Sequence, residues 1–267
     1  MIQVTQEIPT RTRTWTAKDL SEFVANSVKS AQKGTEPFLH LVLRHVFPED
    51  LYTAMVKAMP VYDDYRPMHG RSKAKNTQGN STRVKIDLFP EYIRHLPKGK
   101  REIWDIVGHA LCSKTVQNAF IRALAPELEK RFGPGYARTG FFPIPILTRD
   151  IPGYKIKPHT DTHWKGITVQ LYLPEDASTS YVGTIFHERL ADGSMPKKTQ
   201  MQFIPNSGYA FSVSDYSWHS ADPVGPEVTS RDSILLTYFV DSGPLRVIRN
   251  RGKRLGNFIS NEVRNWR

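Results

Sequence analysis

In the first half of the chain, apolar and polar positions alternate with a helical period. From Leu20 to Val28 an apolar residue recurs every three or four positions, the spacing of one buried helix face. Thr16 and Asp19 form a typical start signal, and Gly34 suits the residue just past the end. To about residue 135, the predicted elements are this helix, a strand at 37–46, helices at 48–59, 101–111 and 114–131, and a long loop at 62–85.

The second half changes to the period-two alternation that is typical of β-strands. Proline, glycine, asparagine and aspartate separate short segments in which every second residue is apolar. The predicted strands are 138–149, 154–159, 166–173, 182–187, 200–204, 208–213 and 231–240. Many short strands at this spacing favour a β-sandwich or jelly roll, with the helices of the first half as a supporting layer.

Composition indicates a folded protein of the cytoplasm. The 267 residues are 39% hydrophobic and 11% aromatic, which is enough for a sizeable core. A single cysteine, Cys112, excludes an internal disulfide, and the first residues lack the apolar stretch of a secretion signal. No apolar run approaches the roughly 18 residues of a membrane span.

The charge balance favours anionic partners. There are 37 basic and 26 acidic side chains, hence a formal charge of 37 − 26 = +11. Basic residues gather at 71–85 and at 246–254. Such clusters are usually solvated surface. If both flank the same binding site, they indicate an anionic substrate. The glycines and charges of loop 62–85 are typical of a mobile lid.

The stretch KPHTDTHWKG, residues 157–166, contains a candidate metal site. His159 and Asp161 lie two apart at a predicted strand, so both side chains point to one face and can bind one ion. With nine histidines in the chain, this pair alone is a weak signal. His163 also lies two from Asp161, but three successive inner positions would crowd one ion, so we expect His163 beside the ion or substrate. His187 is expected on the surface.

A downstream segment strengthens the metal hypothesis. His219 is expected at a strand end, and Arg231 follows twelve residues later on the inner face of an apolar strand. A buried guanidinium is costly unless it meets an anion, and its fork suits a carboxylate, to which Ser233 is expected to add a hydroxyl hydrogen bond. A structural salt bridge from Arg231 to Asp215, Asp222 or Asp232 is the alternative. Two histidines and one carboxylate are the ligands of non-haem iron(II) oxygenases.

These residues resemble a known family. The motif HTD at 159–161, His219, and RDS at 231–233 are similar to the Fe(II)/2-oxoglutarate-dependent dioxygenases, in particular the prolyl-4-hydroxylase-like branch. The resemblance covers roughly residues 140–242. It implies His159, Asp161 and His219 as iron ligands and Arg231 as the partner of the C5 carboxylate of 2-oxoglutarate. It also implies that Tyr172 supports that carboxylate.

The resemblance also implies a fold and a reaction. The fold is a double-stranded β-helix, of the jelly-roll or cupin-like type, with an N-terminal helical layer. One domain would span residues 1–267, with helical support at 1–135, the catalytic β-helix at 136–242 and a basic extension at 243–267. The reaction consumes O₂ and 2-oxoglutarate, releases succinate and CO₂, and hydroxylates an unactivated C–H bond. Because Asp161 is present, oxygen insertion is favoured over halogenation.

Several functions fit this sequence. The favoured substrate is a small polar or anionic metabolite, such as an amino acid, a sugar or a nucleotide-linked intermediate. Alternatives with the same chemistry are oxidative demethylation of alkylated nucleic acid and hydroxylation of a protein side chain. Nucleic acid is less favoured, because no aromatic stacking platform accompanies a basic stripe. Outside enzymes, the alternatives are a jelly-roll protein that binds a metal or anion, and a nucleic-acid-binding module built on the basic tail.

Overall fold

Two antiparallel sheets form the centre of the molecule. A computed structural model describes residues 14–68, 75–76 and 78–241. The larger sheet contains β1 (Gln32–Gly34), β2 (His40–Arg44), β3 (Arg66–Pro67), β4 (Arg83–Asp87), β5 (Gly140–Asp150), β7 (Lys165–Tyr172), β10 (Ser207–Ser212) and β12 (Arg231–Asp241). The smaller sheet contains β6 (Ile156–His159), β8 (Ile185–His187), β9 (Lys197–Gln200) and β11 (His219–Ala221). Within the described residues, the orders are β1-β2-β10-β7-β12-β5-β4-β3 and β6-β11-β8-β9.

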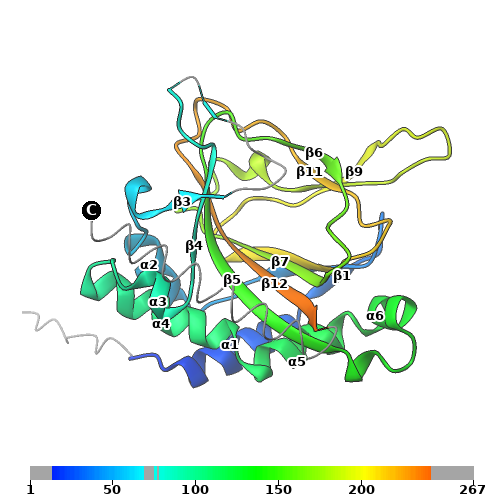
Figure 1. Ribbon diagram of the computed structural model, residues 1–267, viewed down its shortest axis with the longest axis horizontal. Coiled ribbons are helices and arrows are strands. Elements are labelled where there is room, and N and C mark those ends of the chain that lie inside the picture. Colours follow the sequence, from blue (N-terminus) through cyan, green and yellow to red (C-terminus); the bar gives the residue numbers. More distant parts are fainter. Residues whose placement is uncertain (1–13, 69–74, 77, 242–267) are drawn as a thin grey trace, which may run out of the picture.

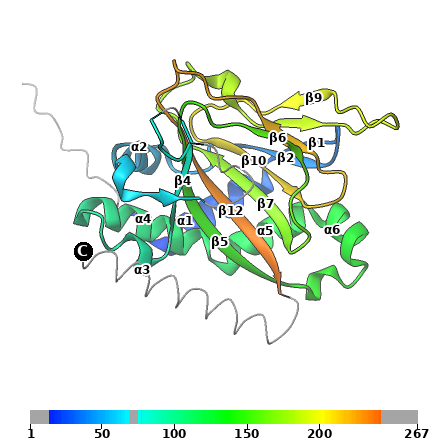
Figure 2. The ribbon, with the colours of Figure 1, turned by 45° about the horizontal axis from the view of Figure 1, so that its top comes forward.

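Helices cover one face of the larger sheet, and the smaller sheet lies on its other side (Figures 1 and 2). The helices are α1 (Ala17–Lys29), α2 (Glu49–Lys57), α3 (Pro90–Ile93), α4 (Lys98–Leu111), α5 (Lys114–Ala123) and α6 (Ala125–Phe132). Short 3-10 turns occur at Tyr62–Asp64, Tyr136–Arg138 and Ser180–Val182. Among the described residues, no helix combines the length and the apolar character needed to cross a bilayer.

The predicted start of the first helix is confirmed. The Thr16 hydroxyl accepts from the Asp19 backbone N–H at 3.1 Å, and the Asp19 carboxylate accepts from the Thr16 backbone N–H at 3.4 Å. These reciprocal contacts satisfy donors that the helical ladder leaves open. The helix ends at Lys29 with Ser30 as its C-cap, so Gly34 does not follow it directly and is instead the last residue of β1.

Alternation along β7 separates two cores. Ile167, Val169 and Leu171 belong to an apolar cluster with the helices, which includes the buried Trp104. The intervening Thr168 and Gln170 are also buried, but they line the space between the sheets. A second, more aromatic cluster fills part of that space, with Tyr172, Phe186, Phe203, Tyr209 and Phe211 among its members. The larger sheet is therefore buried on both faces, and its inner face carries polar groups.

Some predicted elements differ from the structure. The helix predicted at 114–131 divides at Leu124, because Pro126 lacks an N–H and is suited to the first turn of a new helix. The strand predicted at 200–204 is wrong: β9 ends at Gln200. The segment 182–187 begins as a 3-10 turn, and only its end forms β8.

The predicted loop at 62–85 is partly strand. It contains β3 and the start of β4, and β4 pairs with β5 from Arg83↔Asp150 to Asp87↔Ile146. Charged residues alternate with the apolar Val84 and Ile86 along β4, so the segment resembles a polar loop in composition. The lid prediction depends largely on residues 69–74 and 77, which lie outside the described residues, as does the basic extension at 243–267.

Gly183 allows the close approach of two segments behind the site. A Cβ at this position would lie 1.5 Å from the Met201 carbonyl oxygen, a backbone atom. We expect Gly183→Ala to lower the free energy of unfolding by about 1–3 kcal/mol, measured by urea denaturation, because the backbone must move. Gly99→Ala, in α4 with nothing within 4 Å of the added Cβ, is the control and should not destabilise. Equal stability of the two variants would contradict this expectation.

Candidate metal centre

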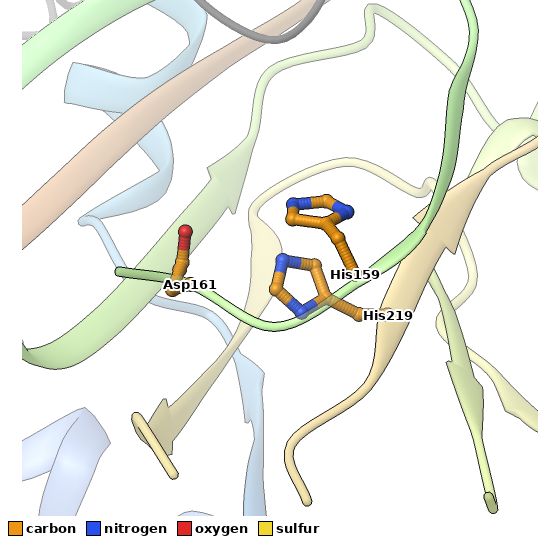
Figure 3. A group of neighbouring side chains, drawn as sticks. All are labelled: His159, Asp161 and His219. Carbon is orange, nitrogen blue, oxygen red and sulfur yellow. The ribbon is translucent and has the colours of Figure 1, made fainter. Parts of the chain in front are cut away.

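Three predicted ligands converge at the edge of the smaller sheet (Figure 3). His159 ends β6, and its antiparallel partner on β11 is His219. Asp161 follows two residues after His159, beyond the strand, rather than within it as the alternation predicted. One ligand atom from each side chain lies within 4.8 Å of the others, and the imidazole centroids are 4.3 Å apart. The three side chains can therefore bind one ion.

Backbone carbonyls set the orientation of both imidazoles. The Nδ1 of His159 lies 2.9 Å from the Lys157 carbonyl oxygen, and the Nδ1 of His219 lies 3.0 Å from that of Ser217. A carbonyl only accepts, so each Nδ1 carries the hydrogen and donates it. This tautomer places the ring lone pair on Nε2, which is the form of histidine that binds a metal.

Asp161 is held in its charged form. Its carboxylate accepts from the Lys165 ammonium at 2.7 Å and from the Thr168 hydroxyl at 2.6 Å. Burial acts to raise the pKa of Asp161, but the charge of Lys165 and the hydrogen bonds from Lys165 and Thr168 hold that pKa below its usual range. Two imidazole nitrogens and one carboxylate oxygen suit iron(II), with coordination positions left for other ligands. The side chains present thus fit the implied metal.

The three ligands form one wall of a cavity between the sheets. Its volume is about 360 Å³, near the lower end of the roughly 300–1,000 Å³ typical of small-molecule sites. The other lining residues are Met68, Arg83, Tyr154, Ile156, Thr162, Lys165, Thr168, Gln170, Thr184, Tyr209, Ser220, Ala221, Arg231 and Leu235. Both sheets contribute to the lining, so a ligand here would contact the metal ligands and the polar face of the larger sheet together.

Arg231 lines the cavity and is 1% exposed. One of its terminal nitrogens donates to the Thr184 hydroxyl at 3.1 Å, and the other lies 3.5 Å from the Asp150 carboxylate. Its Nε has no hydrogen-bond partner in the described part of the chain. A buried donor without an acceptor is costly, so this guanidinium is suited to an incoming anion. Asp232, one alternative partner considered from the sequence, pairs with Arg149 instead.

The other two predicted anchors support the lining instead of forming it. Ser233 shares a hydrogen bond with Thr148 at 2.9 Å and accepts from the Gln170 side-chain amide at 2.9 Å. Tyr172 accepts from the Thr184 backbone N–H at 2.9 Å. In the described residues, neither side chain lines the cavity.

A tyrosine that the sequence did not single out does line the cavity. Tyr209 lies next to Tyr172 in the aromatic cluster, with ring centroids 5.9 Å apart. Its hydroxyl donates to the Gln170 side-chain carbonyl at 2.7 Å and lies 3.0 Å from the Thr184 hydroxyl. Gln170 and Thr184 thereby connect Tyr209 to Ser233 and Arg231 in one polar network.

Sequence reasoning also missed an ion pair beside Arg231. Asp150 is fully buried and accepts from Arg83 through both carboxylate oxygens, at 2.5 and 2.8 Å. The Arg83 guanidinium lies over the Tyr154 ring, 4.2 Å from its centroid. Asp150 is the register partner of Arg83 on one side and of Arg231 on the other. The signal was the alternation of Arg83, Lys85 and Asp87 with apolar residues, which placed them on one strand face.

The remaining predicted histidines lie outside the metal-binding group. His163 is exposed, and its ring contacts that of Trp164 with centroids 5.0 Å apart. The surface position predicted for His187 is wrong: the side chain is 3% exposed and contacts the Ser220 hydroxyl at 2.7 Å. His187 therefore packs behind β11 and helps to fix the strand that carries His219.

Comparisons with known proteins give remote structural similarities. No protein-family model matches the chain, and no curated protein matches it in sequence. A Pseudomonas putida prolyl-4-hydroxylase is 16% identical with a TM-score of 0.48, over 84% of this chain and 100% of that one. A prolyl hydroxylase from Trichoplax adhaerens, in complex with a hypoxia inducible factor peptide fragment, is 13% identical with a TM-score of 0.49, over 84% and 90%.

A third similar structure is a 2OG-Fe(II) oxygenase family oxidoreductase from Burkholderia pseudomallei. It is 13% identical with a TM-score of 0.42, over 88% of this chain and 95% of that one. All three scores are below 0.5, so these similarities do not establish an activity for this chain.

Removal of one ligand tests the metal centre. We expect His219→Ala to weaken binding of Fe(II) by more than about a hundredfold, because one of three protein donors is lost. Anaerobic titration with Fe(II) under equilibrium dialysis measures this directly. His163→Ala, also near Asp161 but outside the three-residue group, is the matched control and should bind as wild type does. If His163→Ala weakens Fe(II) binding and His219→Ala does not, His163 is the ligand in place of His219.

Proposed function

We propose that this protein is an Fe(II)- and 2-oxoglutarate-dependent oxygenase that hydroxylates a C–H bond. One observation carries the proposal: a group suited to iron(II) and the buried Arg231, whose Nε has no acceptor in the described residues, line the same cavity. A 2-oxo acid with a second carboxylate fits both features. It offers a chelating end for the metal and a distal anion for the guanidinium.

The strand order supports the fold that accompanies this activity. From β5 to β12 the chain passes from one sheet to the other at every step except from β8 to β9, which are neighbours in the smaller sheet. We propose that these strands form a double-stranded β-helix and that the chain is a single oxygenase domain with the helices as its support. In this arrangement both sheets supply side chains to one central cavity.

The protein's own residues would have separate tasks. His159, Asp161 and His219 would hold the metal, and Arg231 with the Thr184 hydroxyl would hold the distal carboxylate of 2-oxoglutarate. Bound iron(II) would supply the activation of O₂ that couples decarboxylation of 2-oxoglutarate to oxidation of the substrate. Phe211 packs against His219, with ring centroids 5.1 Å apart, and keeps water from that side of the imidazole.

We further propose a small polar or anionic metabolite as the substrate. Arg83 and Lys165 line the cavity with Arg231, and each is mostly buried in an ion pair. Cationic walls in a narrow space favour an anionic small molecule over an apolar one. Hydroxylation of a protein side chain and demethylation of nucleic acid use the same centre and are alternative outcomes of a substrate screen.

Cosubstrate binding is the first test. Under anaerobic conditions, adding 2-oxoglutarate to the Fe(II)-loaded protein should produce the weak visible charge-transfer band of a chelated complex. We expect Arg231→Ala to need at least about tenfold more 2-oxoglutarate for the same band, because a charged hydrogen-bond partner is lost. Arg149→Ala, which breaks an ion pair outside the cavity lining, should titrate as wild type does. The absence of a band in wild type would contradict the proposal and favour a non-catalytic binding protein.

A substrate screen separates the remaining alternatives. Fe(II)-loaded protein with O₂ and 2-oxoglutarate should release succinate faster when the correct substrate is present. We expect stimulation from pools of amino acids, sugar phosphates or nucleotides. Stimulation confined to peptides or to methylated oligonucleotides would instead support one of the alternatives, and an oxidised product identified by mass spectrometry would fix the bond attacked.

A further inference from the structure

Three charged side chains lie in a row across the inner face of the larger sheet. Asp150 on β5 is the register partner of Arg83 on β4 and also of Arg231 on β12. Arg83 and Arg231 both line the cavity, and Asp150 lies between them with no exposed surface. We call these residues the charge row.

The charge row carries one excess positive charge. Two guanidinium groups face one carboxylate, and Asp150 interacts more closely with Arg83 than with Arg231. Arg83 takes both oxygens of Asp150, at 2.5 and 2.8 Å, whereas Arg231 lies 3.5 Å from one of them. Interactions between charges are strong in a buried setting, so an added carboxylate would bring the row to neutrality.

We propose that Arg83 is a positioning residue that makes this site selective for a dicarboxylate 2-oxo acid. The proposal depends on the function proposed above. Arg83 engages Asp150 and so prevents that carboxylate from neutralising Arg231. Arg231 keeps its attraction for the distal carboxylate of 2-oxoglutarate. Without Arg83, Asp150 pairs fully with Arg231 and repels the incoming anion.

A neighbouring ion pair, Arg149–Asp232, has only a structural role and can be compared with Arg83–Asp150. Arg149 precedes Asp150 on β5 and Asp232 follows Arg231 on β12, so this register pair occupies the opposite face of the sheet. Arg149 contacts both oxygens of Asp232, at 2.7 and 3.2 Å, and neither residue lines the cavity. This pair has similar burial and geometry to Arg83–Asp150 but no second arginine, which makes it a matched control.

The test compares two ligands of equal chain length. 2-Oxoglutarate carries the distal carboxylate, whereas 2-oxopentanoate has a methyl group in its place. Affinities of the Fe(II)-loaded protein are measured by anaerobic calorimetry. We expect Arg83→Gln to lower the affinity for 2-oxoglutarate by at least about tenfold. The affinity for 2-oxopentanoate should change by less than about twofold. Arg149→Gln should leave both affinities unchanged.

Two further variants separate charge from folding. Arg83→Lys keeps the positive charge and should retain most of the preference for 2-oxoglutarate. The double variant Arg83→Gln/Asp150→Asn removes the carboxylate that would neutralise Arg231, so it should recover at least the wild-type preference. Because the readout is a ratio of two affinities in one variant, a general loss of folded protein does not imitate the effect.

Each outcome decides the proposal. Equal weakening of both ligands in Arg83→Gln, or a double variant as unselective as the single one, would overturn the role of Arg83 while the oxygenase proposal stands. If wild type prefers 2-oxoglutarate and Arg83→Gln keeps that preference, Arg83 is only structural. If wild type binds 2-oxoglutarate no better than 2-oxopentanoate, the proposed function fails and the role of Arg83 fails with it.

Discussion

Burial of the Arg231 guanidinium is the constraint on which the cavity depends. A charged group in this position requires opposite charge and hydrogen-bond acceptors, and the described residues offer only the Thr184 hydroxyl at 3.1 Å and an oxygen of Asp150 at 3.5 Å. Arg83, which holds Asp150, and Tyr209, which contacts Thr184, are therefore coupled to Arg231 although they lie on different strands. Most polar groups on the inner face of the sheet contact one another, and the Arg231 Nε is left without an acceptor among the described residues.

The apolar outer face explains why helices are needed. Residues such as Val169 and Leu171 on β7 alternate with the polar network and would be exposed without a cover. Helices α1, α4 and α5 supply that cover (Figure 2), and Trp104 of α4 is fully buried in the shared cluster. The helices support the sheet on one side, and its other side lines the cavity, which suits a site that needs fixed geometry.

Local pattern together with the family resemblance singled out His159, Asp161, His219 and Arg231, and the structure brings these four side chains to one cavity. His159, Asp161 and His219 are close together because two strand ends are register partners, and Arg231 begins the long strand that alternation predicted. Arg83 and Asp150 were missed, since their significance arises from pairing between strands 67 residues apart in sequence. Tyr172 and Tyr209 show the same limit: both are buried on adjacent strands, and only tertiary packing decides that Tyr209 meets the cavity.

The combination of features favours an enzyme over a simple binding protein. A site that only bound a metal would need the three ligands, and a site that only bound an anion would need Arg231 with Thr184. Here both open onto a cavity of about 360 Å³, and strand β7 contacts both groups. Thr168 donates to Asp161, and Gln170 accepts from Tyr209, which contacts Thr184. A ligand that satisfies both ends must be oriented along the cavity. Fixed orientation of a cosubstrate beside a metal is what a catalyst requires and what a binding protein has no need to maintain.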